Sequence, residues 1–205
     1  ELLRKPDGRC YLRVQSAATP DAEADQWLVK ARSAGPLREG GRRRRTAWFT
    51  RAPCTCAYAY GGLTVAARSF PPWMDQLLEV VMPICGINGR EYWPNSCNLN
   101  LYETGRDYTP WHRDDEDIFE GASKPTKVIG LSLGGVRAFQ YRRRDISASK
   151  DSPSGPLVTM PVANGDLMIM EGDFQQRYQH QLAREEEAPV RINLTWRWVT
   201  AHAPG

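Results

Sequence analysis

The sequence predicts an α+β fold in which helices support a β-sandwich or barrel. Two segments carry helical spacing with start signals, and short segments of alternating apolar and polar residues follow them. Helices followed by many short strands fit a layered sheet architecture. The 205 residues can form one domain with a sizeable core, so folding requires neither disulfides nor a metal.

Both expected helices lie in the N-terminal half. The first follows Thr19-Pro20-Asp21, which supplies an N-cap, a proline at the first helical position and an early acid, and it stops at Gly35-Pro36. The second follows Pro71-Pro72 and stops at Pro83. The apolar residues at helical spacing are Ala24, Trp27, Leu28 and Ala31 in the first helix and Trp73, Leu77 and Val81 in the second.

The strands expected after the helices are short and are separated by turn signals. Their ranges are 96–102, 127–135, 137–143, 157–162, 166–170 and 191–199. Gly134-Gly135 and Asn164-Gly165 mark turns, and the segment 145–156, rich in serine, proline and charge, reads as a loop between strands. We therefore expect a single domain over residues 1–205.

Composition indicates an intracellular protein, nuclear or cytoplasmic. No apolar run approaches the roughly 20 residues of a membrane span, and the N-terminus lacks the apolar segment of a signal peptide. It also lacks an initiator methionine, so a targeting sequence can precede it. The five cysteines form no repeated pairs and are expected to be reduced; Cys54-Thr55-Cys56 is too tightly spaced for a usual zinc knuckle. Nothing indicates an oligomer.

The net charge of +3 is small, but the charges are clustered. Basic runs occupy 42–45 and 142–144, and acidic runs occupy 114–117 and 185–187. Basic runs are usually solvated loops, but they also suit a polyanionic partner.

The last expected strand presents a polar face. On a strand, Arg191, Asn193, Thr195 and Arg197 point to one side and apolar residues to the other. If the polar side meets solvent, two arginines need no explanation. If it faces the inside of a barrel, two desolvated guanidiniums require anions, and a dicarboxylate would supply one at each end.

His112, Asp114 and His180 are candidate metal ligands. The HxD pair supplies two ligands from one turn, and His180 follows 68 residues after His112. Two histidines and one carboxylate form the facial triad of non-haem Fe(II) oxygenases, which leaves positions for a co-substrate and O₂. HxD alone would more often be a surface loop, and a zinc hydrolase could use the same ligands. Arginines 11 and 17 residues after His180 favour iron with 2-oxoglutarate. The remaining histidine, His202, is expected to play no part.

The strand expected at 96–102 has an unusual polar face. Asn98, Asn100 and Tyr102 share it, where a core strand would be apolar. Buried polar groups need partners, and a bound dicarboxylate would be a natural one.

These segments resemble the AlkB family of Fe(II)/2-oxoglutarate dioxygenases, the direct-reversal nucleic-acid demethylases. The resemblance is carried by NLY (100–102), WHRDDE (111–116), VIGLSLGGVRAF (128–139), NGDLMIMEG (164–172), YQH (178–180) and RINLTWR (191–197). TAWFT (46–50) and YAYGGL (58–63) match more loosely, and the first 40 residues match little beyond a helix. The family implies a double-stranded β-helix (jelly-roll) core at about 95–200, buttressed by N-terminal helices, with a nucleotide-recognition lid at about 41–70.

The resemblance also implies roles for individual residues. His112, Asp114 and His180 would bind Fe(II). Arg191 would pair with the distal carboxylate of 2-oxoglutarate and Arg197 would hold the carboxylate near the metal. The pocket would be completed by Asn100, Tyr102, Asn193 and Thr195. The implied reaction converts 2-oxoglutarate and O₂ to succinate and CO₂ and hydroxylates an N-methyl group, which leaves as formaldehyde.

The substrate side follows from the same match. Asp115 and Glu116 match acids that contact the flipped base, where a carboxylate attracts the cationic ring of N1-methyladenine or N3-methylcytosine. Tyr58 and Tyr60 match aromatic residues of the lid, and a strand packed on the core would explain them equally well. The run 42–45 would track phosphates, or is a solvated loop.

Three functions fit the sequence. The first is a demethylase of single-stranded DNA or RNA, the second an oxygenase acting on a protein or another substrate that is not a nucleic acid, and the third a catalytically silent nucleic-acid-binding module. No aromatic wedge of the double-strand-specific members can be identified, and RTAWFT and NLY followed by WHRDDE favour the single-strand and RNA-acting relatives. The filled ligand positions argue against the silent module, and the acidic pair with the basic runs argues against a substrate other than nucleic acid.

Overall fold

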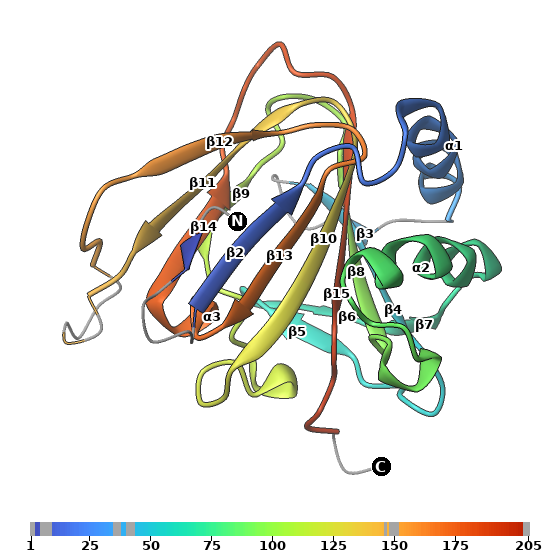
Figure 1. Ribbon diagram of the computed structural model, residues 1–205, viewed down its shortest axis with the longest axis horizontal. Helices are drawn as coiled ribbons and strands as arrows, with labels where there is room; N and C mark the ends of the chain where they lie inside the picture. Colours follow the sequence, from blue (N-terminus) through green and yellow to red (C-terminus); the bar gives the residue numbers. More distant parts are fainter. Residues whose placement is uncertain are drawn as a thin grey trace.

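Two facing β-sheets form the centre of the molecule, with two helices on the outer side of the larger sheet (Figure 1). The computed structural model describes residues 10–34, 44–145, 147 and 152–202, together with the backbone of 3–4 and 38–39. The expected α+β fold with helices supporting a sandwich is therefore confirmed.

The larger sheet is antiparallel apart from one short edge strand. Its strands, in spatial order, are β1 (Leu3–Arg4), β2 (Cys10–Gln15), β13 (Leu167–Gly172), β10 (Thr126–Gly134), β15 (Arg191–Arg197), β8 (Ser96–Tyr102), β4 (Arg45–Thr50) and β3 (Arg38–Glu39). The edge strand β7 (Ala67–Ser69) pairs parallel with β4.

The smaller sheet contains β12 (Val158–Val162), β11 (Arg137–Arg143), β14 (Tyr178–Leu182) and β9 (Thr109–His112), in that order. The short helix α3 (Phe174–Arg177) leads into β14. A separate hairpin joins β5 (Tyr58–Tyr60) to β6 (Leu63–Val65) through two glycines with φ of +53° and +79°. Such a turn needs positive φ at both central positions, which glycine adopts without steric cost.

Helix α1 (Asp21–Arg32) and helix α2 (Pro72–Ile84) begin within one residue of the predicted starts. In α1 the N-cap is Pro20 and not Thr19, so the proline precedes the first helical residue, and α2 includes Pro72. The expected stop of the first helix at 35–36 lies outside the described residues. Pro83 falls inside the last turn of α2 rather than ending it. The remaining helical turns are the 3₁₀ segments η1 (Arg90–Tyr92) and η2 (Asp117–Phe119). No helix among the described residues combines the length and apolar character that a membrane crossing needs.

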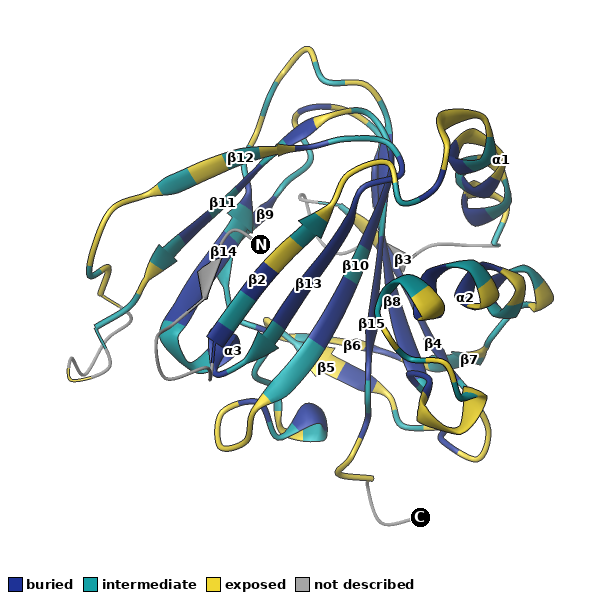
Figure 2. Cartoon of the chain, in the orientation of Figure 1, coloured by how far each residue is buried: buried dark blue, intermediate teal, exposed yellow. Residues whose placement is uncertain are grey.

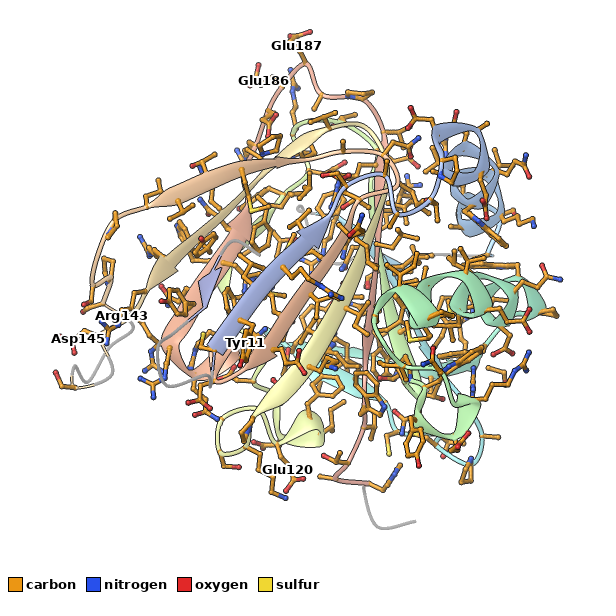
Figure 3. The ribbon with its side chains drawn as sticks, viewed as in Figure 1. Tyr11, Glu120, Arg143, Asp145, Glu186 and Glu187 are labelled. Carbon is orange, nitrogen blue, oxygen red and sulfur yellow. The ribbon has the colours of Figure 1, made fainter. Side chains whose placement is uncertain are left out.

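The six predicted strands all form, with ends that differ by at most two residues from the expected ranges. The loop expected at 145–156 is described in part, and an isolated bridge joins its residue Pro153 to Arg144, which immediately precedes the loop. Glu186 and Glu187 lie at the exposed tip of the connection between β14 and β15 (Figure 3).

The alternation on β15 divides the core in two. Ile192, Leu194 and Trp196 point toward the helices, where they join the apolar cluster that includes residues of α1 and α2. The opposite face, which carries Arg191 and Arg197, points between the sheets, and these side chains are 3% and 2% exposed. Figure 2 shows the same burial along the central strands. The arginine face therefore meets the interior and not solvent, as the dicarboxylate interpretation requires.

Candidate active site

A cavity of about 520 Å³ opens between the two sheets. The thirteen residues to which the resemblance gives site roles all line it: Tyr58, Tyr60, Asn100, Tyr102, His112, Asp114, Asp115, Glu116, His180, Arg191, Asn193, Thr195 and Arg197. They come from β5, β8, β9, β14, β15 and the turn after β9. The topology thus brings together residues that are far apart in sequence.

The candidate metal ligands converge at one end of this cavity. His112 on β9 and His180 on β14 are direct partners across the smaller sheet, and Asp114 lies in the turn that follows β9. One donor atom from each of the three residues lies within 4.8 Å of the others. The Nε2 atoms of His112 and His180 lie 3.9 and 3.6 Å from the carboxylate of Asp114.

The protonation of these groups fits a bound cation. Burial lowers the pKa of both imidazoles, that of His180 to about 3, so both are neutral near neutral pH. His112 Nδ1 lies 2.8 Å from the carbonyl oxygen of Pro110 and donates its proton there, which leaves a lone pair on Nε2. That lone pair faces the Asp114 carboxylate, an arrangement that is unfavourable unless a cation lies between them. The donor set therefore fits Fe(II), which takes two imidazoles and one carboxylate.

Arg197 holds the carboxylate ligand from the other side. Its Nη1 donates to Asp114 Oδ1 and to the Tyr58 hydroxyl, both at 3.0 Å. Its guanidinium also stacks on Phe119, 4.3 Å from the ring centroid. Burial alone would raise the pKa of Asp114, but the positive charge of Arg197 outweighs this effect, and the pKa is lowered. The carboxylate is therefore ionised and available to a metal.

Arg191 lies toward the other end of the polar face of β15 and has a different environment. Its Nη2 donates to Ser132 Oγ at 2.7 Å and to Asn193 Oδ1 at 3.2 Å, and its Nε is buried without a partner. Burial lowers the pKa of the guanidinium to about 10. Within the described part of the chain, no carboxylate lies at ion-pair distance from Arg191. A buried cation without an anion is costly, so this environment suits an anionic ligand.

The polar face of β8 lies beside the two arginines. Asn100 and Asn98 pair with Asn193 and Thr195 of β15, so that their side chains share the cavity face. The Tyr102 hydroxyl lies 2.7 Å from the hydroxyl of Thr109. The buried polar row expected from the sequence therefore exists, and part of its hydrogen bonding is satisfied by the protein.

Tyr58 contacts both the apolar core and the cavity, which are the two positions considered for it from the sequence. Its ring is buried against Trp48, with centroids 4.7 Å apart, while its hydroxyl reaches the cavity and donates to Glu116 Oε1 at 2.6 Å. The Tyr60 ring lies 4.5 Å from that of Tyr58. Burial raises the pKa of Glu116, although Arg197 opposes the shift.

The two acidic residues thus differ in their contacts. Glu116 faces Tyr58 and Arg197, whereas Asp115 forms an ion pair with Arg113 at 2.7 Å. Each carboxylate therefore already has a partner within the protein, and each retains further acceptor sites for a ligand.

Two residues of this region were not identified from the sequence, and a third, Arg44, was expected only as part of a basic run that would track phosphates. Ser132 of β10 lies opposite Asn193 and accepts a hydrogen bond from Arg191. The sequence feature that could have identified it is a single hydroxyl residue within an otherwise apolar strand segment. Arg44 donates to Asn100 Oδ1 at 2.7 Å and lines the cavity. It belongs to the basic run 42–45, of which 42 and 43 lie outside the described residues. Arg137 is fully buried and donates to the carbonyl oxygens of loop residues near β9.

Comparison with known proteins agrees with this geometry. Residues 12–197 match the family model described as the 2OG-Fe(II) oxygenase superfamily. The human DNA oxidative demethylase ALKBH2 is 29% identical over 141 residues, which is 68% of this chain and 51% of that protein. The alpha-ketoglutarate-dependent dioxygenase alkB homolog 3 of Bos taurus is 32% identical over 158 residues, 76% of this chain and 51% of that protein. The chain spans about half the length of these relatives.

Solved structures show the same fold. The structure of OsALKBH1 matches with a TM-score of 0.60 at 16% identity, covering 91% of this chain and 97% of that one. The epimerase SnoN matches with a TM-score of 0.56 at 15% identity, covering 96% of this chain and 81% of that one. These matches confirm the double-stranded β-helix fold, and the sequence matches confirm the resemblance. The chain belongs to the 2OG-Fe(II) oxygenase superfamily and, within it, to the AlkB family.

Proposed function

We propose that the chain is an Fe(II)/2-oxoglutarate-dependent dioxygenase that oxidatively demethylates N-alkylated bases in nucleic acid. Family membership implies Fe(II), 2-oxoglutarate and O₂ as metal and co-substrates. The names of two relatives, an oxidative DNA demethylase and an alkB homologue, support the substrate class. The observation that carries the proposal is the environment of two arginines on one face of β15. Arg197 contacts Asp114 of the His₂Asp cluster, and Arg191 is buried with no carboxylate among the described residues at ion-pair distance.

His112, Asp114 and His180 would hold the iron. Iron with 2-oxoglutarate and O₂ supplies the oxidising power, and succinate and CO₂ are the co-products. The protein contributes two neutral imidazoles and a carboxylate that Arg197 keeps ionised. Pro110 fixes the orientation of the His112 ring through its carbonyl oxygen.

Arg191 and Arg197 would bind the two carboxylates of 2-oxoglutarate. Arg191, positioned by Ser132, would take the distal carboxylate, and Arg197 would take the one near the metal. The Nε of Arg197 is buried and has no hydrogen-bond partner among the described residues, so the guanidinium keeps a donor beyond those used by Asp114 and Tyr58. The walls of this pocket would be formed by Asn100, Tyr102, Asn193 and Thr195.

The opposite part of the cavity would receive the base. Tyr58 and Tyr60 would offer ring faces for stacking, which contributes about 1–3 kcal/mol per base. Asp115 and Glu116 would supply the negative charge that distinguishes cationic N1-methyladenine and N3-methylcytosine from the unmodified bases. The hairpin of β5 and β6 would form part of a nucleotide-recognition lid at about 41–70, above a catalytic core at about 95–200, in one domain.

Basic and aromatic residues beside the cavity suit a single strand of DNA or RNA. Arg44 lines the cavity, and the Arg142 guanidinium lies 4.0 Å from the Trp111 ring centroid, next to His112. Phosphate contacts from arginine and stacking on aromatic rings are the usual means of binding unpaired strands. A nucleic-acid substrate would place the protein in the nucleus or cytoplasm.

The test is mass spectrometry of short oligonucleotides that carry N1-methyladenine or N3-methylcytosine. Single-stranded DNA, duplex DNA and RNA are offered with Fe(II), 2-oxoglutarate and ascorbate, beside an Asp114→Ala control. The expected result is methyl loss that depends on 2-oxoglutarate, fastest on a single-stranded substrate. If no oligonucleotide changes while 2-oxoglutarate is still converted to succinate, the substrate is not a nucleic acid and the demethylase proposal fails.

A further inference from the structure

A second group of metal-ligating side chains lies outside the cavity. Cys54, Cys56 and His202 each place one donor atom within 4.8 Å of the others, and none of them lines the cavity described above. The Cys56 Sγ and His202 Nδ1 atoms are 3.5 Å apart, although 146 residues separate them in sequence. Cys54 is buried, Cys56 is half-buried and His202 is exposed, so the group reaches from the interior to solvent.

Backbone hydrogen bonds hold the two cysteines in place. The Trp48 indole Nε1 donates to the carbonyl oxygen of Cys56 at 2.8 Å, and the Thr50 hydroxyl donates to that of Cys54 at 2.7 Å. The backbone N–H of Cys54 also donates to the Arg51 carbonyl oxygen at 3.0 Å. The short CxC loop is therefore ordered before any ligand arrives.

The segment that carries His202 is also held. The backbone N–H groups of Thr200 and Ala201 both donate to the carbonyl oxygen of Ile118, at 3.0 and 3.3 Å. The Thr200 hydroxyl donates to Glu120, which is labelled in Figure 3, at 2.9 Å. His202 was expected from the sequence to play no part, but these contacts hold its segment so that the imidazole lies beside Cys56.

We propose that Cys54, Cys56 and His202 bind a zinc ion. Two thiolates and an imidazole are ligands that zinc takes, and three protein ligands leave a fourth position for water. With Zn–S of about 2.3 Å and Zn–N of about 2.0–2.1 Å in tetrahedral geometry, a sulfur and a nitrogen lie about 3.5 Å apart. The observed separation between Cys56 and His202 equals that distance.

Zinc binding at this site should depend on pH. A cysteine thiol must lose its proton before its sulfur can bind zinc as a thiolate. Zinc binds the thiolate and releases that proton, so its affinity rises as the pH rises. The close approach of Cys56 and His202 could instead be a thiol–imidazole hydrogen bond, which would show no metal binding.

The ion would join two segments that continue into the cavity. Tyr58 follows Cys56 by two residues, and Arg197 precedes His202 by five. The Tyr58 hydroxyl and the Arg197 guanidinium are themselves hydrogen-bonded at 3.0 Å. A zinc ion at this position would fasten the hairpin of β5 and β6 to the end of β15. This inference does not depend on the activity proposed above.

The experiment is titration of the reduced, metal-free chain with Co(II), a spectroscopic substitute for zinc. A thiolate bound to Co(II) gives a charge-transfer band that the His₂Asp cluster cannot give, because that cluster contains no sulfur. We expect one thiolate-bound cobalt per chain, displaced by one equivalent of zinc. We expect the same band in a His112→Ala variant, which disables the other cluster.

Variants separate a metal site from a hydrogen-bonded pair. His202→Gln changes an exposed side chain, and its metal affinity should fall by more than the 10–100-fold typical of losing a supporting partner. Cys54→Ser combined with Cys56→Ser should abolish the band. Cys85→Ser is the matched control, because burial raises the pKa of that thiol to about 11 and it belongs to neither cluster. Absence of the band in the parent chain, or its persistence in the double serine variant, overturns the proposal.

Discussion

Arg197 Nη1 lies 3.0 Å from Asp114 Oδ1, and both side chains are buried between the two sheets. The arginine belongs to β15 in the larger sheet, and the aspartate follows β9 in the smaller one. The pair therefore joins the two sheets at the candidate metal site. It also couples the ionisation of a metal ligand to a residue proposed to bind 2-oxoglutarate.

Replacing Arg197 with methionine should destabilise the metal-free protein by about 3–5 kcal/mol near neutral pH, because Asp114 loses its buried cation. In the parent chain the pKa of Asp114 is lowered, so the pair contributes stability above the ordinary value of 3.8 and loses it as the pH falls through the lowered value. In Arg197→Met, burial raises that pKa instead, so the variant loses stability as the pH rises. The difference between the two proteins should therefore be larger near neutral pH than in acid, as urea unfolding at several pH values would measure.

Lys124→Ala is the control for this comparison. Lys124 pairs with Glu120 on the surface, and the loss of such a pair costs less than about 1 kcal/mol. An equal loss in Arg197→Met and Lys124→Ala, or a loss that does not change with pH, would contradict the importance assigned to the buried pair.

Arg191→Gln should weaken 2-oxoglutarate binding by about 10–100-fold, because a charge-assisted hydrogen bond contributes about 1.5–3 kcal/mol. Ser132→Ala, which removes a neutral partner of Arg191, should weaken it by about fivefold, or about 1 kcal/mol. Calorimetric titration of the metal-loaded protein measures both effects. The exposed Arg106→Gln variant is the control. Unchanged affinity in Arg191→Gln, with the fold intact, would place the dicarboxylate elsewhere.

Alternation and motif order predict the central sheet and the cavity well. On β15, strict alternation assigns Arg191 and Arg197 to one face. Antiparallel pairing then places Asn98 and Asn100 on the same face, opposite the residues between the two arginines. Strand β2 also alternates, with Cys10 and Leu12 buried, and the same pattern could have identified it. Strands β9 and β14 are harder to recognise, since they contain a proline, histidines and glutamines that serve the cavity or the sheet edge.

Contacts between residues that are distant in sequence could not be predicted from local sequence patterns. Arg137 looks like any arginine at a strand start, yet it is fully buried because loop carbonyls from residues 105 and 107 surround it. His202 meets Cys56 only because the chain after β15 returns to the loop that precedes β5. The partners of the acidic residues are likewise set by folding and not by spacing: Glu116, for example, accepts hydrogen bonds from Tyr58 and Arg197.

His112→Ala and Asp114→Ala should each abolish conversion of 2-oxoglutarate to succinate, because a cluster of three ligands reduced to two no longer holds iron in its facial arrangement. Iron content after reconstitution should fall in parallel with turnover. Asp75→Asn is the control. Asp75 lies on the outer helix α2, pairs with Arg51 and does not line the cavity. Turnover that survives in His112→Ala would remove that residue from the metal site.

Glu116→Gln should reduce activity selectively on cationic bases. The substitution keeps the size of the side chain but removes the charge, whose attraction to a cation at about 4 Å is at most about 4 kcal/mol near a protein surface. In the free protein Glu116 already contacts Tyr58 and Arg197, which offsets part of that attraction, so we expect kcat/KM for N1-methyladenine to fall by about 10–100-fold, or about 1.4–2.7 kcal/mol. N1-methylguanine is uncharged, and its slower reaction should change by less than about threefold.

The comparison of the two bases identifies the charge as the cause. A general disturbance of the site would lower both reactions together, because both bases use the same iron and co-substrate. Asp117→Asn provides the matched control, as Asp117 is an exposed acid next to Glu116 that does not line the cavity. Equal losses on the cationic and the neutral base would show that Glu116 supports the fold of the site through Tyr58 and Arg197 and does not select the lesion by its charge.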